Sequence, residues 1–145
     1  MKLNIRPLSY EDYDNILIGW WKDWGWKEAP ARDFLPQQGE GGVIVYYNNI
    51  PVCAGFLYNT NSKIAWITWV ISNKEYRGKK RQEGVVLLLT ELEKIGKNIG
   101  AKYIFTNNDN SRLIETFIKL GYSSSNSSND SNFFSFNRGG NNKKF

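Results

Sequence analysis

A group of cationic side chains in one short stretch of the sequence could bind a multiply charged anion. The group consists of Lys74, Arg77, Lys79, Lys80 and Arg81. The residues before it form an apolar, strand-like run and those after it have helical periodicity, which places the cations in a strand-to-helix turn. The first N–H groups of a helix have no intrahelical acceptor, so such a turn binds phosphate groups. Several phosphates would match this charge better than one carboxylate, whereas a solvated basic turn is the alternative interpretation.

Composition limits the chemistry that the chain can perform. It has no histidine and one cysteine, Cys53, which excludes an internal disulfide, a multi-cysteine metal site and a histidine base. Cys53 lies in an apolar run and is expected to be a small core residue. We therefore predict no metal site.

Length and charge suggest one basic globular unit. The chain has 145 residues, 41% of them hydrophobic, and a formal charge of +5 that favours anionic partners. We expect a single domain over residues 1–136, in which 123–132 are too polar to bury, and a frayed tail over 137–145. The absence of a long apolar run and of a signal-peptide pattern predicts a soluble, cytoplasmic protein. The sequence leaves the oligomeric state open, and a homodimer is one possibility.

The first half of the chain has the pattern of a helix followed by an antiparallel meander. Leu3–Pro7 alternates like a short strand, and a helix begins after Ser9 and ends near Gly25. The next segment, 26–36, should be a loop with at most one helical turn. Three strands rich in Val, Ile, Tyr and Trp follow, at Gly42–Asn48, Ile50–Thr60 and Ile64–Ser72.

The second half has a strand–helix–strand pattern. Glu83–Asn98 is an amphipathic helix that Gly100 ends, and Lys102–Asn107 is the fifth strand. Because such crossovers are right-handed, this strand should lie parallel to the fourth. A last helix, capped by Asn110 or Ser111, should end at Gly121, and Phe133–Phe136 should form an edge strand.

These elements resemble the core of the GNAT superfamily of acyl-CoA N-acyltransferases. The similarity consists of Tyr76-Arg77-Gly78-Lys79 after a strand, the amphipathic helix, the strand Tyr103–Asn107, then Asn110 and Leu120-Gly121-Tyr122. The family motif at the turn is R/Q-x-x-G-x-G/A. Arg77 matches its first position, and Lys80 and Gln82 replace its two small residues. The resemblance implies an α/β (α+β) fold: a mixed central sheet with antiparallel N-terminal strands, parallel strands 4 and 5, and helices on both faces.

The resemblance also implies where acetyl-CoA would bind as the acyl donor. The turn that would hold its pyrophosphate consists of Arg77, Gly78, Lys79, Lys80, Arg81 and Gln82. Val70 and Ser72 would supply backbone bonds to the pantetheine. Asn110 matches an asparagine often found near that arm, and a simple helix N-cap is the equal alternative.

Two catalytic functions are left open by the resemblance. The family tyrosine that protonates the departing thiolate falls at Phe117, which has no proton to give, so that role is vacant or has moved. An amine acceptor must lose a proton before it attacks a thioester. The candidates for this base are Glu28, Asp33, Glu40, Asp109 and a water held by backbone carbonyls; for each acid alone, solvated surface charge is the more common role.

A tryptophan cluster is the most unusual local feature. Trp20 and Trp24 share a helical face and are expected in the core. Trp21 and Trp26 cannot both point the same way and, if exposed, would form an aromatic rim beside the acceptor site that this family has. An aromatic-rich core is the alternative for all four residues.

Three functions from different classes follow from these observations. The first is acyl transfer from acyl-CoA to an amine on a small molecule or protein. The second is modification of a nucleic-acid base on the same fold, for which the basic surface and the aromatic rim are the motive. The third is a catalytically inactive member that binds CoA or a partner, motivated by Lys80, Gln82 and Phe117.

Overall fold

The structure, a computed structural model, describes residues 3–108, 110–124 and 132–136 and divides into two compact units. The first unit comprises residues 1–56 and 69–92, and the second 57–68 and 93–145. Strands β3 (Ile50–Asn59) and β4 (Ile64–Ser72) and helix α3 (Lys79–Asn98) each run from one unit into the other.

The first unit contains an antiparallel meander. Strand β1 (Leu3–Pro7) pairs with β2 (Gly42–Tyr47), which pairs with β3, and β4 follows in the strand order. Val45 is the common point of the register, opposite Ile5 on one side and Cys53 on the other. Asn48, in the β2–β3 turn, has a φ of 58°, a conformation that asparagine tolerates better than most residues. The predicted meander is confirmed.

The helical segment after β1 is continuous but changes type. It consists of α1 (Tyr10–Asp12), a π-helical turn η1 (Tyr13–Leu17) and α2 (Ile18–Asp23), after which Gly25 has a φ of 91°. Two 3₁₀ turns follow, η2 (Arg32–Phe34) and η3 (Pro36–Gly39). The helix, its end at Gly25 and the single helical turn expected within 26–36 are therefore confirmed, and η3 lies almost entirely beyond that segment.

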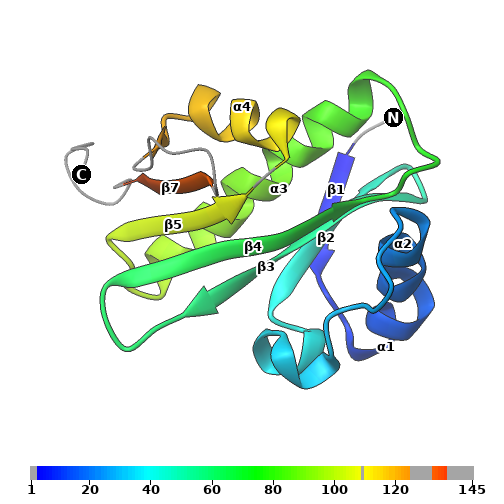
Figure 1. The fold of residues 1–145 in the computed structure, drawn as a ribbon, viewed down its shortest axis with the longest axis horizontal. Coiled ribbons are helices and arrows are strands. Elements are labelled where there is room, and N and C mark those ends of the chain that lie inside the picture. Colours follow the sequence, from blue (N-terminus) through cyan, green and yellow to red (C-terminus); the bar gives the residue numbers. More distant parts are fainter. Residues whose placement is uncertain (1–2, 109, 125–131, 137–145) are drawn as a thin grey trace. The chain divides into compact units, whose positions relative to one another are not determined.

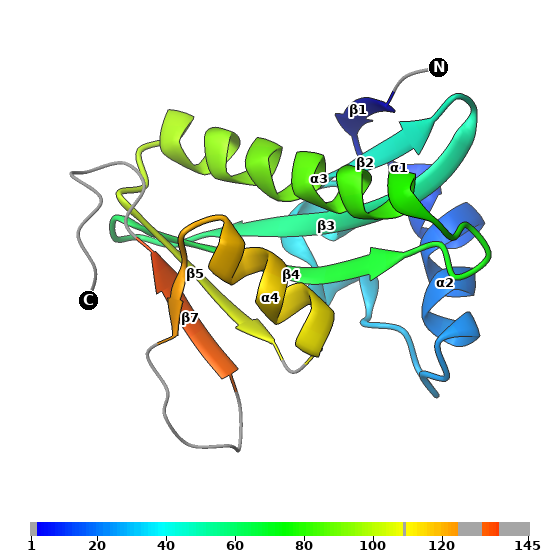
Figure 2. The same ribbon diagram turned by 90° about the horizontal axis from the view of Figure 1, so that it is seen from above.

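The sheet of the first unit is covered on both faces (Figures 1 and 2). On one face, the helical residues Leu17, Trp20 and Trp21 form a buried cluster with Ile44, Ala54, Phe56 and Ile71. The opposite face packs on α3, where a Cβ added at Gly84 would lie 3.1 Å from Val52 Cγ1. A larger residue at Gly84 would have to displace the Val52 side chain by a few tenths of an ångström. Cys53 lies on the α3 face, and burial raises its thiol pKa to about 12, as expected of an unreactive core cysteine.

The second unit contains the parallel pair. Strand β5 (Tyr103–Asn108) pairs in parallel with β4, from Ile64 opposite Tyr103 to Ile67 opposite Thr106. Helix α4 (Ser111–Lys119) follows, and Gly121 has a φ of 104° just after it. The mixed sheet with parallel strands 4 and 5 is thus confirmed.

One expected helix boundary and one expected strand position are wrong. Helix α3 begins at Lys79 instead of Glu83, because Lys, Arg and Gln favour a helix and Gly78 supplies the preceding turn. Strand β7 (Asn132–Phe136) is not an edge strand, since it lies between β5 and the short strand β6 (Ser123–Ser124). Two residues are too few to show a strand pattern in the sequence.

The polar segment 125–131 and the tail 137–145 lie outside the described residues. In the described part of the chain, no helix is both long and apolar enough for a membrane span.

Candidate anion-binding site

The turn between β4 and α3 is organised by Asn73. Its N–H donates to Val52 O at 2.8 Å, and its side-chain amide donates to Pro51 O at 2.9 Å. Its own carbonyl accepts hydrogen bonds from Tyr76 N–H and from Arg81 Nη2, at 3.1 and 2.8 Å. Asn73 was not among the predicted site residues, although asparagine after a strand is a common turn signal.

Gly78 sets the start of α3. It has a φ of 111°, and its carbonyl accepts the N–H of Arg81 at 3.1 Å. Lys79 and Lys80 are the first helical residues, so helix geometry gives their N–H groups no acceptor within the helix. The turn therefore presents backbone donors at the positive end of a long helix dipole, an arrangement that suits an anion.

The cations of the turn fall into two groups, which the sequence could not distinguish. Lys74 donates to Asp23 O at 3.2 Å, Lys80 pairs with Glu83 at 3.2 Å, and Arg81 donates to Asn73 O. The hydrogen bond from Lys80 to Glu83 raises the pKa of this lysine. Arg77 and Lys79, in contrast, are exposed and have no side-chain ion pair or hydrogen bond to any described residue. These two cations are the ones free to meet a ligand.

Lys80 and Gln82 occupy positions that are small residues in the GNAT motif. Both lie inside α3, and neither is among the described residues with positive φ. The backbone of this chain therefore needs no glycine at either position. Within residues 77–82, Gly78 alone has positive φ and needs the freedom of glycine.

Val70 and Ser72 approach the turn from the end of β4. Val70 is half-buried on the α3 face, where a Cβ added at Gly55 would lie 3.3 Å from its Cγ2. The carbonyl of Ser72 accepts the indole N–H of Trp24 at 2.9 Å. Backbone bonding of these residues to a pantetheine remains a prediction.

The tryptophans are arranged differently from the expectation. Trp20 is buried as predicted, but Trp24 is 42% exposed, and Trp21 is buried at 1% exposure. The predicted core position of Trp24 is wrong because α2 ends at Asp23, and the indole extends beyond the core onto the turn. Trp26 is 44% exposed, as an aromatic rim requires.

Trp26 belongs to a group of rings on the surface of the first unit. Its ring lies 5.9 Å from that of Trp69, which lies 5.8 Å from that of Phe34. Phe34 is 62% exposed. Trp69 has a φ of 58°, a rare conformation for a bulky residue, and such outliers occur often at functional sites.

The predicted residues of the second unit have local structural roles. Asn110 caps α4, accepting the N–H of Leu113 at 3.0 Å, so its N-cap role is confirmed. Phe117 is fully buried, and its ring lies 4.8 Å from that of Tyr122. A hydroxyl at Phe117 would lie inside packed protein, so the burial of this ring argues against a catalytic acid at this position.

The carboxylates proposed as bases are all on the surface where the structure describes them. Glu28, Asp33 and Glu40 are exposed, and Asp109 lies outside the described residues. This exposure favours solvated charge over catalysis for each of the first three.

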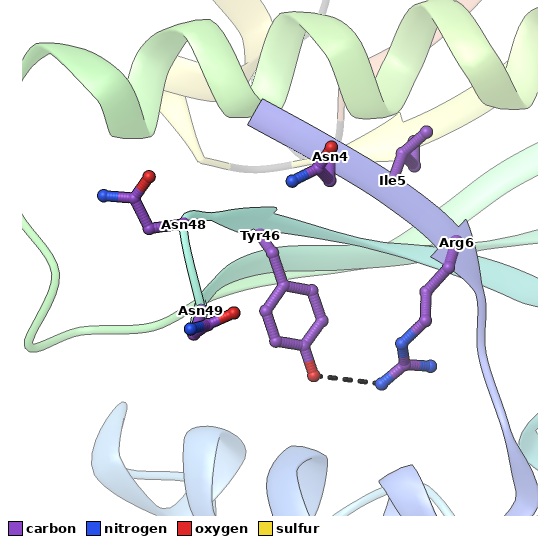
Figure 3. Close-up of a pocket in the computed structure, with 6 residues that line it drawn as sticks. All are labelled: Asn4, Ile5, Arg6, Tyr46, Asn48 and Asn49. Atoms are coloured by element: carbon purple, nitrogen blue, oxygen red, sulfur yellow. Dashed lines mark hydrogen bonds between the residues drawn. The ribbon is translucent and has the colours of Figure 1, made fainter. Parts of the chain in front are cut away.

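A shallow pocket of about 220 Å³ lies elsewhere in the first unit (Figure 3). It is lined by Asn4, Ile5, Arg6, Tyr46, Asn48 and Asn49. Arg6 is the cation in this lining, and it already bonds Tyr46 and Asp12. The pocket therefore offers an anion less free charge than the turn does.

Comparison with known proteins identifies the fold. No family model and no curated protein sequence matches the chain significantly. Diaminobutyrate acetyltransferase EctA from Paenibacillus lautus, solved with its substrate and coenzyme A, matches with a TM-score of 0.73 and 15% identity over 98% of both chains. An N-acetyltransferase from Staphylococcus aureus Mu50 matches with a TM-score of 0.69 and 14% identity over 94% of this chain and 99% of that one. PaiA N-acetyltransferase from Thermoplasma acidophilum, in complex with coenzyme A, matches with a TM-score of 0.67 and 17% identity over 93% of this chain and 98% of that one. The chain has the fold of the GNAT acetyltransferases.

Proposed function

We propose that this protein is an N-acyltransferase that moves an acyl group, with acetyl the expected one, from acyl-CoA to an amine. The observation that carries the proposal is the turn itself: Arg77 and Lys79 are exposed and unpaired among the described residues, beside the free N–H groups that begin α3. Its place after the fourth strand of a GNAT fold supports coenzyme A as the anion.

Each part of the turn would have a separate task in binding acetyl-CoA. The N–H groups of Lys79 and Lys80 would donate to the pyrophosphate, and the side chains of Arg77 and Lys79 would neutralise its charge. The backbone of Val70 and Ser72 would align the pantetheine. The coenzyme would supply a thioester, whose thiolate is a good enough leaving group to depart without a protein acid. The burial of Phe117 is compatible with this, because no tyrosine-like acid is then required.

The acceptor would be an amine on a small molecule or a protein. EctA was solved with L-2,4-diaminobutyric acid, a small diamine, which supports this class of acceptor. Trp26 and Phe34 are exposed on the segment that follows α2, and we assign them to one wall of the acceptor site. Their rings would pack against the apolar part of the acceptor.

The test is coenzyme binding followed by transfer. Acetyl-CoA at about 100 times its Kd should stabilise the protein by about 2.7 kcal/mol, visible as a rise in Tm. Arg77→Glu and Lys79→Glu should each reduce this rise without lowering the Tm of the free protein. Lys94→Glu is the matched control, because it makes the same change of charge at an exposed site further along α3. Release of CoA thiol across an amine panel then tests transfer. No Tm shift at millimolar acetyl-CoA would overturn the proposal.

A nucleic-acid acceptor is the second candidate. It is supported by the charge of +5 and by the exposed rings of Trp24, Trp26 and Phe34, which could stack with bases. Phosphate contacts would make such binding strongly salt-dependent. Binding of single-stranded DNA that weakens steeply with salt, together with acetyl transfer to it, would favour this candidate over a small amine.

A further inference from the structure

One exposed indole contacts three separate parts of the turn. Trp24 is 42% exposed, so much of its ring surface stays in water. Its Nε1–H nevertheless donates to Ser72 O at 2.9 Å, at the end of β4. The Nζ of Lys74 lies 5.1 Å from the centre of its ring, and the Cζ of Arg81 lies 5.7 Å from it.

These contacts fix the turn at both ends. Ser72 is the last residue of β4, Lys74 lies at the start of the turn, and Arg81 is in the first helical turn of α3. Arg81 also donates to Asn73 O, and Lys74 to Asp23 O, the residue before the indole. Trp24 thus connects the strand, the turn and the helix that together present the free N–H groups.

The indole also reduces electrostatic repulsion between cations of the turn. Two cations held close to the same ring repel each other, and they add to the field of Arg77 and Lys79. The negative face of an indole attracts both cations and so offsets part of this repulsion. Without the ring, the side chains of Lys74 and Arg81 would lose this attraction and would be held less firmly against the turn.

We propose that Trp24 is a positioning residue for the phosphate-binding turn, holding Ser72, Lys74 and Arg81 so that the N–H groups at the start of α3 are arranged before the coenzyme arrives. This inference rests on the proposed function. Preorganisation improves affinity because the ligand need not order the turn on binding. The pantetheine arm should depend on Trp24 less, since β4 is already held by sheet pairing.

Trp24→Leu tests the inference, and Trp26→Leu is its control. Both indoles lie in the same segment and are similarly exposed, at 42% and 44%, but the ring of Trp26 packs against Trp21 and Trp69. We expect Trp24→Leu to raise the Kd of acetyl-CoA about tenfold and that of acetyl-pantetheine, which lacks the phosphates, by less than about twofold. Trp26→Leu should leave both donor affinities within about twofold of the unsubstituted protein. Trp24→Phe keeps a ring but not the N–H, so its Kd for acetyl-CoA should lie between the values for Trp24→Leu and Trp26→Leu.

A second measurement needs no coenzyme. Hydrogen exchange of the amides in 73–78 should be faster in Trp24→Leu than in Trp26→Leu at equal global stability. Equal exchange in the two variants would overturn the inference, and so would an equal loss of affinity for both donors in Trp24→Leu. If Trp24→Leu does not fold, the same comparisons apply to Trp24→Phe. Failure of the unsubstituted protein to bind acetyl-CoA would instead overturn the proposed function, and with it this inference.

Discussion

The guanidinium of Arg6 holds the carboxylate of Asp12 at two points, with hydrogen bonds of 2.8 and 3.0 Å, and so joins β1 to the first helical segment. The N–H of Ser9 donates to the same carboxylate at 2.7 Å. Burial of Asp12 raises its pKa, but the hydrogen bonds from Arg6 and Ser9 outweigh burial, and the net pKa is below its ordinary value of 3.8.

The first prediction is that Asp12 stabilises the fold above pH 4 or so and not in acid. A carboxyl whose folded pKa is lowered contributes stability above its unfolded pKa, and that contribution is lost as pH falls through the folded pKa, here below about 3.8. Asp12→Asn should therefore lower the free energy of unfolding by about 1–3 kcal/mol at neutral pH, and the difference should shrink in acid. Urea unfolding at several pH values measures both.

The control for Asp12 is Asp14→Asn. Asp14 pairs with Arg32 at 3.0 Å, but its side chain is 68% exposed. Its loss should cost less than about 1 kcal/mol. Equal effects of the two substitutions, at all pH values, would contradict the special role of Asp12.

The second prediction concerns Phe117. Because this ring is fully buried, Phe117→Tyr places a hydroxyl inside packed protein and should destabilise the fold by about 1–3 kcal/mol. Ile118→Tyr, at a position 51% exposed on the same helix, should change stability by less than about 0.5 kcal/mol. A neutral Phe117→Tyr that raises turnover on an active amine would show that the position faces the thioester after all.

The sequence predicted the fold well because period and turn chemistry are local signals. The alternation of apolar and polar residues predicts the meander, and a glycine after a helical pattern predicts the helix end at Gly25. The handedness of crossovers predicts the parallel β4–β5 pair. Helical spacing also placed Trp24 with Trp20. That inference failed because α2 ends at Asp23, one residue before Trp24. The helical spacing of the apolar residues continues to Trp24, so the spacing alone does not show that this side chain has left the core face.

The candidate site was predicted less completely than the fold. The sequence pattern located the cations of the turn. It did not show that Lys80 pairs with Glu83 while Arg77 and Lys79 remain exposed. Such pairing depends on side-chain directions that only the folded helix defines. The positive φ of Trp69 also has no sequence signal, because bulky residues rarely adopt it.

The third prediction separates conformational strain from crowding at Gly78. A Cβ at Gly78 would meet no atom within 4 Å, and the same is true of Gly19 in α2. Gly78 has a φ of 111°, so Gly78→Ala should cost about 1–3 kcal/mol through strain alone and should weaken acetyl-CoA binding by distorting the turn. Gly19→Ala should stabilise α2 by about 0.5–1 kcal/mol. Thermal unfolding compares the two, and equal signs would refute the role of Gly78 in setting the start of α3.

The last prediction distinguishes a core tryptophan from one in the acceptor wall. Trp21 is 1% exposed, so Trp21→Ala should leave a cavity and cost about 3–5 kcal/mol. Trp26 packs on Trp21 and Trp69 with 44% of its surface exposed, so Trp26→Ala should cost clearly less stability. If Trp26 belongs to the acceptor wall, its loss should raise the KM for the amine while the Kd of acetyl-CoA stays unchanged, because the wall and the phosphate-binding turn are formed by different residues. Steady-state kinetics with each substrate varied in turn makes the distinction. A change in stability with no change in acceptor KM would make Trp26 a packing residue and remove the aromatic rim from the acceptor site.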